Sequence, residues 1–173
     1  VVFGLSGGLD SAVVAALEGS RPLLVEIQAL VSPTGYGVPR RMTAGVDYNR
    51  VALIAAVLEK RMGLNLGSQD LYVNAVGGVK LDEPALDLAI ACVLVSSFRD
   101  VPVDPALVCA GEIGLTGELR PVTGVQKRIK EAFKMGFSRF LTASRSALPD
   151  LEENPGILMA DTLAGALELA LKV

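Results

Sequence analysis

The sequence contains no histidine. Without an imidazole group the chain cannot build a Ser-His-Asp or Cys-His catalytic site, and the usual histidine-containing zinc sites are excluded as well. Any hydrolytic chemistry would need a Ser-Lys pair, paired carboxylates or a metal ion held by oxygen ligands. The absence of one residue type therefore leaves few routes to catalysis.

Cysteines are scarce and long apolar runs are absent. Cys92 and Cys109 each lie inside a short apolar segment, with no CxxC spacing, which predicts reduced core residues and no metal site. No apolar run reaches the ~18 residues that a membrane helix needs, and the first residues do not form a signal peptide. These features predict a cytoplasmic domain with no membrane partner.

Positive charge is not in excess, since 16 Lys and Arg face 19 Asp and Glu and the net charge is −3. A nucleic-acid partner would then need a local basic cluster. Two clusters qualify, one in a Gly/Pro-rich segment and one in an expected helix. They are Arg40 with Arg41, and Lys127 with Arg128, Lys130 and Lys134. The alternative for each cluster is an ordinary solvated face, with Glu131 as a partner on the helix.

The segment SGGLDS, residues 6–11, follows an apolar run and resembles the SGGxDS phosphate loop of ATP pyrophosphatases. In that interpretation the backbone amides of Gly7 and Gly8 and a following helix N-terminus would bind pyrophosphate. The alternative is a Gly-rich turn between strands at residues 1–5 and 11–17. Nothing later in the sequence matches an ATP pyrophosphatase, so the turn is favoured.

The remaining patterns predict one domain of mixed α and β structure. Helix signals agree best at residues 48–62, where Asp47 is the expected N-cap and Gly63 the stop. Thr123 is expected to cap a helix at 124–135, and Asp161 to start a last helix. A buried helix is predicted at 84–98, and strands at 21–32, 70–78, 106–115 and 138–143.

Several long motifs occur in an order that is found in one known family. They are RPLLVEIQALVS, PRRM, DYNRVALIAAVLEKR, GGVKLDEPALDLAIA and GEIGLTGELRPV. They resemble the Lon protease domain and, more closely, the C-terminal Lon-like domain of the bacterial RadA family, also called Sms. The resemblance covers residues 12–173. It implies an α/β fold of the Lon-protease-like type, in an α+β arrangement with mixed sheets and about four helices. Residues 1–173 would be one such domain, a C-terminal fragment of a longer protein.

The resemblance also locates the two positions of the Lon catalytic dyad. Lon proteases carry a serine nucleophile in PKDGPSAG and an activating lysine in GGLKEK, which fall here on KLDEPALD and TGVQKR. The nucleophile position is Ala85 and the lysine position is Gln126. Neither a methyl group nor a carboxamide can do the required chemistry. Lys127 is rotated by about 100° on the helix, and Ser96 and Ser97 lie about three turns beyond Ala85.

Three carboxylates, Asp82, Glu83 and Asp87, surround the same motif and could bind a divalent cation. The favoured alternative is that they cap the helix and complement its dipole. In the motif GEIGLTGELR, a structural hairpin is expected in which Glu112 and Glu118 pair with Arg120.

For function, the resemblance implies a non-catalytic scaffold that assembles as a homo-hexameric ring. It would form part of a DNA path and position a RecA-type ATPase motor for branch migration in homologous recombination and DNA repair. Implied partners are DNA, further copies of the chain and a RecA-type recombinase. The candidate DNA contacts are Arg40, Arg41, Lys127 and Arg128. The chain lacks a GxxxxGK[ST] loop and a CxxC finger, so ATP, Mg and Zn are expected only in regions outside it. Two alternatives are a ring-forming module without DNA affinity and an active Ser-Lys peptidase.

Overall fold

The structure is a computed structural model that describes residues 2–3, 10–146, 148 and 153–171. The Gly-rich segment at 6–11 lies mostly outside the described residues. Only its last two positions, Asp10 and Ser11, are described, and Ser11 begins a strand. The expectation that the chain from Ser11 onward is a strand, in place of a phosphate-binding helix, is therefore confirmed.

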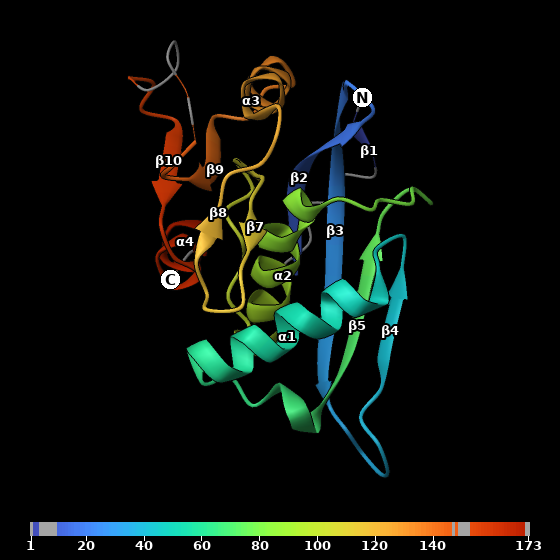
Figure 1. The fold of residues 1–173 in the computed structure, drawn as a ribbon. Helices are drawn as coiled ribbons and strands as arrows, with labels where there is room; N and C mark the ends of the chain where they lie inside the picture. Colours follow the sequence, from blue (N-terminus) through green and yellow to red (C-terminus); the bar gives the residue numbers. More distant parts are fainter. Residues whose placement is uncertain (1, 4–9, 147, 149–152, 172–173) are drawn as a thin grey trace.

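A mixed β-sheet runs through the described part of the molecule (Figure 1). Its order is β10–β9–β6–β2–β3–β5–β4, and β1 pairs with β3. The strands are β1 (Val2–Phe3), β2 (Ser11–Glu18), β3 (Arg21–Pro33), β4 (Arg41–Ala44), β5 (Gln69–Ala75), β6 (Leu107–Cys109), β9 (Arg139–Ala143) and β10 (Ile157–Ala160). A hairpin of β7 (Glu112–Ile113) and β8 (Leu119–Arg120) forms a second small sheet. The pairs β2–β3 and β3–β5 are antiparallel, and β4–β5, β2–β6, β6–β9 and β9–β10 are parallel.

Within the described residues four α-helices accompany the sheet, as expected: α1 (Tyr48–Met62), α2 (Asp87–Arg99), α3 (Val125–Lys134) and α4 (Leu163–Ala170). Two 3-10 turns, η1 (Leu66–Ser68) and η2 (Pro84–Leu86), precede β5 and α2. The first helix follows its sequence signals closely. Asp47 accepts a hydrogen bond from the Arg50 amide at 3.0 Å, and Gly63 ends the helix at φ 69°.

The two faces of the sheet are covered differently, because side chains alternate along each strand. On one face α1, α2 and α4 pack over a large core that includes Ile27, Leu71 and Leu94. On the other face α3 packs over a second core that includes Leu24 and Phe140. The helix α2 is buried along nearly its whole length, as its continuous apolar sequence predicts. Among the described residues no helix has the length and apolarity to cross a bilayer.

Several boundaries differ from the sequence-based expectation, among them the end of the strand expected at 70–78, which stops at Ala75. The predicted strand at 106–115 is two strands, because Gly111 leaves the sheet and donates its amide to the carbonyl of Ala85 at 3.1 Å. The N-cap position of the third helix is Gly124, and not Thr123, so this helix has no side-chain cap. The last helix is capped by Thr162, which accepts from the Gly165 amide, and not by Asp161. The short strands β4 and β10 were not predicted.

Candidate functional site

The position aligned with the Lon nucleophile lies in the second core. Ala85 belongs to η2 and is 1% exposed, packed with Leu24, Val125 and Ile129. Val125, which precedes the aligned lysine position Gln126 in the first turn of α3, belongs to the same core. A nucleophile must be reachable by its substrate. This position holds a methyl group and is also covered by apolar side chains.

A buried ion pair connects this region to the sheet. The guanidinium of Arg128 on α3 donates to both carboxylate oxygens of Glu83, with Nη1 to Oε1 at 2.6 Å and Nη2 to Oε2 at 3.1 Å. Its remaining contacts are main-chain carbonyls, Ala15 from Nη1 at 2.7 Å and Thr123 from Nε at 2.9 Å. Glu83 also accepts from the Leu17 amide at 3.1 Å. One arginine thus links α3, η2 and β2 through hydrogen bonds in a fixed planar geometry.

The burial of Arg128 corrects its interpretation as a DNA contact. Its side chain is 1% exposed, so a phosphate could reach the guanidinium only after the Glu83 pair had been broken. The sequence contains a signal for the burial of Arg128 that the DNA-contact interpretation overlooked. Val125, Ile129 and Ala132 recur at helical spacing on the buried face of α3, and position 128 lies on that same face. Periodicity shows which face Arg128 occupies, but it does not identify Glu83 as the partner.

The three carboxylates near η2 do not cap a helix through their side chains, but Asp87 lies in the first turn of α2, where a carboxylate complements the helix dipole, as expected. Neither η2 nor α2 has a side-chain cap. Asp87 is 1% exposed and accepts from Arg50 Nη1 at 2.7 Å and from the Ile113 amide at 3.0 Å. Burial raises the pKa of Asp87, and these two hydrogen bonds oppose the rise. Asp82 is exposed. Within the described residues no group of three or more Asp, Glu, Cys or His side chains is placed to hold a metal ion.

The ion pairs predicted for the hairpin are present. Arg120 on β8 lies 2.7 Å from Glu118 and 3.9 Å from Glu112. A hydrogen bond from the Thr116 hydroxyl to Glu118, reinforced by Arg120, lowers the pKa of Glu118 to about 2. These contacts hold the turn between β7 and β8, so the structural interpretation of this motif is confirmed.

Both cysteines are core residues, as predicted. Cys92 on α2 and Cys109 on β6 are buried and reduced. A hydrogen bond with Cys92, together with burial, raises the pKa of the Cys109 thiol well above its ordinary value. A protonated, buried thiol is a poor nucleophile and a poor metal ligand.

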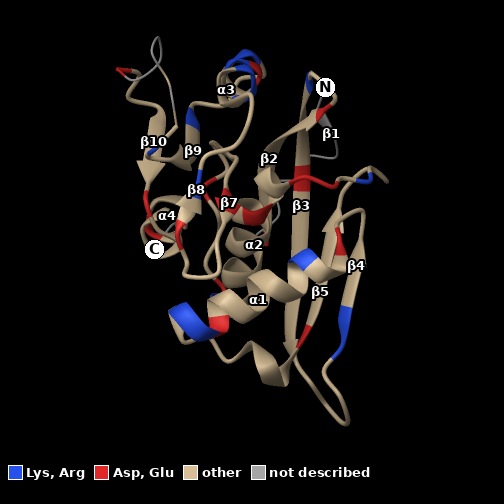
Figure 2. Cartoon of the chain, in the orientation of Figure 1, with Lys and Arg blue, Asp and Glu red and all other residues tan. Residues whose placement is uncertain are grey.

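The exposed face of α3 carries a stripe of lysines. Lys127, Lys130 and Lys134 follow one another at intervals of three and four residues, which places them on one side of the helix, and all three are exposed. Figure 2 shows the basic residues of α3 at one end of the molecule. We call Lys127, Lys130 and Lys134 the α3 stripe.

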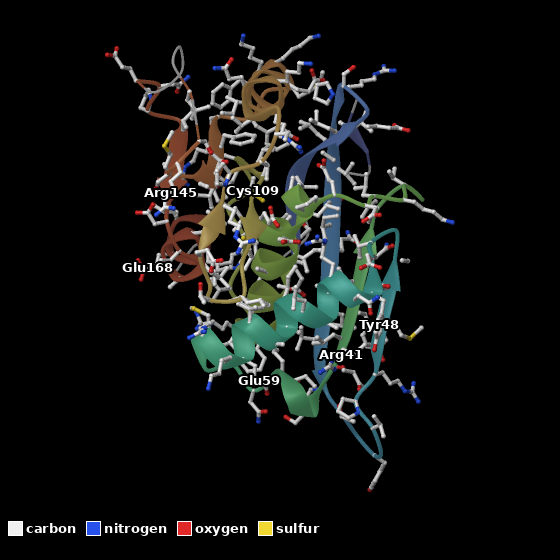
Figure 3. The ribbon with its side chains drawn as sticks, in the orientation of Figure 1. Arg41, Tyr48, Glu59, Cys109, Arg145 and Glu168 are labelled. Atoms are coloured by element: carbon white, nitrogen blue, oxygen red, sulfur yellow. The ribbon has the colours of Figure 1, made fainter. Side chains whose placement is uncertain are left out.

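The other basic pair lies at the opposite end of the molecule, where β4 begins, and Figure 3 labels Arg41 there. The guanidinium of Arg41 donates to the carbonyl oxygens of Gln69 and of Leu66, the latter at 3.0 Å. Arg40 is exposed, and its amide donates to Asp70 Oδ1 at 2.7 Å. The sequence suggested that both arginines are loop residues, but Arg41 is the first residue of β4. The structure does not bring the two basic clusters together.

Comparisons with known proteins agree with this architecture. Residues 46–146, more than half of the chain, match the family described as subunit ChlI of Mg-chelatase. The chain is 57% identical over 136 residues to the DNA repair protein RadA of Bacillus subtilis, covering 79% of this chain and 30% of that relative. It is 51% identical over 170 residues to the RadA protein of Halalkalibacterium halodurans, covering 96% and 36%. The Listeria monocytogenes RadA protein is 50% identical over 168 residues, covering 96% and 37%. The chain thus spans about a third of the length of the curated relatives it matches.

Proposed function

We propose a function for this chain on the basis of its family, since it belongs to the ChlI-type, Lon-like domains of bacterial RadA proteins. The domain serves DNA repair as a non-catalytic scaffold. In this proposal the domain assembles as a homo-hexameric ring and contributes contacts to DNA. The name of the relatives, DNA repair protein RadA, supports a role of this domain in DNA repair. The rest of the proposal concerns what the residues of this chain do.

The absence of peptidase activity is supported by the region around Ala85. The dyad positions offer no nucleophile and no base, and the space between α3 and η2 is filled by an apolar cluster and by the Arg128–Glu83 pair. This pair joins the two elements that carry the dyad positions. The residues at this site therefore stabilise the domain in place of reacting with a substrate.

The DNA contact is supported by the α3 stripe, which is the observation that carries the proposal. Three exposed ammonium groups on one helix face match the need for several cations on one surface to neutralise phosphates. Lys127 belongs to this stripe, whereas Arg128 lies in the core and is no longer proposed as a contact. Arg40 is a second, separate candidate, and Arg41 contributes less because its guanidinium already binds carbonyl groups.

The motor and its cofactors belong to the longer proteins. Since the chain spans about a third of its relatives, we propose that ATP, Mg and Zn bind in regions outside it. Branch migration, recombination and contact with a RecA-type recombinase would likewise be activities of the longer protein. The ring formed by this domain would multiply a weak DNA contact by the number of subunits.

The decisive experiment measures DNA binding across a salt series for two variants. Replacing the α3 stripe by glutamine in a triple variant (Lys127→Gln, Lys130→Gln, Lys134→Gln) should weaken binding to all sequences alike. It should also reduce the salt slope by about 0.9 for each lost phosphate contact on duplex DNA. Arg40→Gln, at the opposite end of the molecule, is the matched control and should change the slope by at most one such contact. Fluorescence anisotropy of labelled duplex and single-stranded DNA gives both quantities.

If both variants bind as the wild type does, the basic clusters are solvated faces and the DNA contact proposed here is wrong. If the wild type itself does not bind DNA but forms rings, the domain is a ring-forming module without DNA affinity.

A second experiment addresses the chemistry. We expect no peptide or casein hydrolysis by the wild type, and none by Ala85→Ser, because the new hydroxyl would be buried and Gln126 cannot take its proton. Fluorophosphonate labelling and a fluorogenic peptide assay check this. Activity that survives repurification and is lost on substitution of one serine would contradict the proposal.

A further inference from the structure

The half of the sheet that α3 leaves uncovered carries a row of apolar side chains. Leu30 on β3 and Met42 on β4 each lie opposite Tyr72 on β5 in the strand register. Their neighbours along the strands, among them Leu71 and Val73, point into the large core, so this row lies on the other face. Leu30 is 54% and Met42 57% exposed. The row is therefore an unpaired apolar strip on the open face of β3, β5 and β4.

The strip lines a hollow of about 350 Å³, which is small enough to receive a few side chains. Its rim includes Gln28 and Asn74, which are opposite each other in the register and supply amide donors and acceptors. The described residues that line the hollow carry no charge. We call this hollow, with Leu30, Tyr72 and Met42 at its centre, the sheet hollow. Its chemistry fits an uncharged apolar group with a hydroxyl better than it fits a phosphate.

The same chain carries an exposed group of that kind. Tyr36 and Val38 lie in the connection from β3 to β4, which extends beyond the sheet in Figure 1, and they are 103% and 85% exposed. A Cβ atom added at Gly35 or Gly37 would meet nothing within 4 Å, so the segment stands clear of the rest of the chain. Gly37 has φ +88°, which a non-glycine residue rarely adopts. We call residues 35–38 the tip.

The tip does not fill the sheet hollow of its own chain. Tyr36 is six residues away from both Leu30 and Met42, about 20 Å of extended chain. It is fully exposed in the structure, and the hollow is open. Both surfaces are uncharged, so bringing them together removes no ionic group from water. Each copy thus offers one apolar projection and one apolar recess at different places.

We propose that the tip of one copy docks into the sheet hollow of the next copy, head to tail. Tyr36 would bury its ring against Leu30, Tyr72 and Met42, and its hydroxyl group would find hydrogen-bond partners in the rim amides. A contact between two different surfaces of the same chain is heterologous, so it either closes a ring or continues as a filament. The inference rests on the self-association in the proposed function and assigns it an interface.

The test uses two variants that damage one side of the contact each. The tip variant is Tyr36→Ser with Val38→Ser, and the hollow variant is Leu30→Ser with Met42→Ser. All four side chains are more than half exposed, so both variants should fold, which circular dichroism and urea denaturation verify. Light scattering over a concentration series should show self-association of each variant weakened on the order of tenfold or more relative to the wild type.

Mixing the two variants gives the sharper result. The tip variant keeps an intact hollow and the hollow variant keeps an intact tip, so an equimolar mixture should form a heterodimer and grow no further. A cysteine pair, Tyr36→Cys in one copy and Met42→Cys in the other, should cross-link between copies under mild oxidation. The native Cys92 and Cys109 are buried and should not interfere.

The outcomes separate this inference from the proposed function. If the wild type assembles and both variants assemble equally well, the head-to-tail contact is wrong while the ring stands. If the variants lose DNA affinity and keep their assembly, the occupant of the hollow is DNA, and the inference is overturned. A wild type that stays monomeric at every concentration overturns both the contact and the ring. DNA binding by the α3 stripe is tested separately by the salt series.

Discussion

Two pairs of adjacent basic residues, Arg40 with Arg41 and Lys127 with Arg128, are alike in the sequence and are used differently in the structure. In each pair the first side chain is exposed and the second is held against the protein. Arg41 stays half-buried at the start of β4 and binds main-chain carbonyls. Arg128 is wholly buried and binds a carboxylate. Two similar pairs of basic residues therefore have different roles, because the second residue stabilises an edge strand in one pair and the core in the other.

The difference follows from the geometry of the two elements. Neighbours on a strand point to opposite faces, and neighbours on a helix are rotated by about 100°. Two adjacent cations can therefore rarely both face one DNA backbone from a regular element. What decides which residue of a pair is exposed is the apolar pattern around it, and on α3 this pattern includes Val125 and Ile129. Charged residues that are neighbours in the sequence form one exposed surface only if the apolar periodicity places them on the same face of the element.

The largest effect is expected at Arg128. Replacing it by methionine (Arg128→Met) leaves Glu83 beside η2 without its partner, so the free energy of unfolding should fall by about 3 kcal/mol. Glu83 is 17% exposed, which keeps the estimate at the low end for a buried pair. Urea denaturation followed by circular dichroism measures the change.

The matched control for Arg128 removes both charges. Arg128→Met combined with Glu83→Leu should recover most of the lost stability, because no buried charge is left unpaired. A single variant that loses less than about 1 kcal/mol would mean that water reaches Glu83 easily, and the contrast between the two pairs would then disappear.

A smaller effect is expected at Arg41. Arg41→Ala removes hydrogen bonds to the carbonyls of Leu66 and Gln69, which should lower the free energy of unfolding by about 1–2 kcal/mol. Arg40→Ala should change it by no more than about 0.5 kcal/mol, because its side chain is on the surface. The same denaturation assay applies to both. Equal losses at the two positions would show that β4 is held mainly by its strand pairing.

The elements that could be predicted from the sequence are those defined by local signals. The helix α1 begins after Asp47 and ends before Gly63, as expected, because its cap, apolar face and stop all lie within one short segment. The strand β3 was also predicted, because its mostly apolar run lies within one short segment of the sequence. By contrast β4 and β10 are short strands that pair in parallel with β5 and β9, and such pairing depends on distant residues.

The start of α3 shows why the remaining details were beyond the sequence. Gly124 has φ +67°, and a Cβ atom there would lie 2.8 Å from a methyl carbon of Leu17, more than one hundred residues earlier. A side chain at this position would need Leu17 to move, so the choice of glycine before the helix depends partly on a distant residue. The candidate site follows the same rule. Ala85 and Gln126 were located by family resemblance, whereas the bond between Arg128 and Glu83 joins segments that no local pattern connects.

The smallest effect concerns pH at the start of β4. The hydrogen bond from the Arg40 amide, supported by the Thr34 hydroxyl and the two arginines, lowers the pKa of Asp70 below its ordinary value of 3.8. A carboxyl group whose pKa is lower in the folded state stabilises the fold above the ordinary pKa. This contribution is lost as the pH falls through the folded value. Below pH 3.8 the wild type should thus lose a stabilising contribution that Asp70→Asn lacks at every pH. The Arg40 amide resonance, followed by NMR during acid titration, should have a midpoint below 3.8 in the wild type and none from this group in Asp70→Asn. A midpoint at or above 3.8 would mean that Asp70 does not hold Arg40, and that Arg41 alone orders this end of β4.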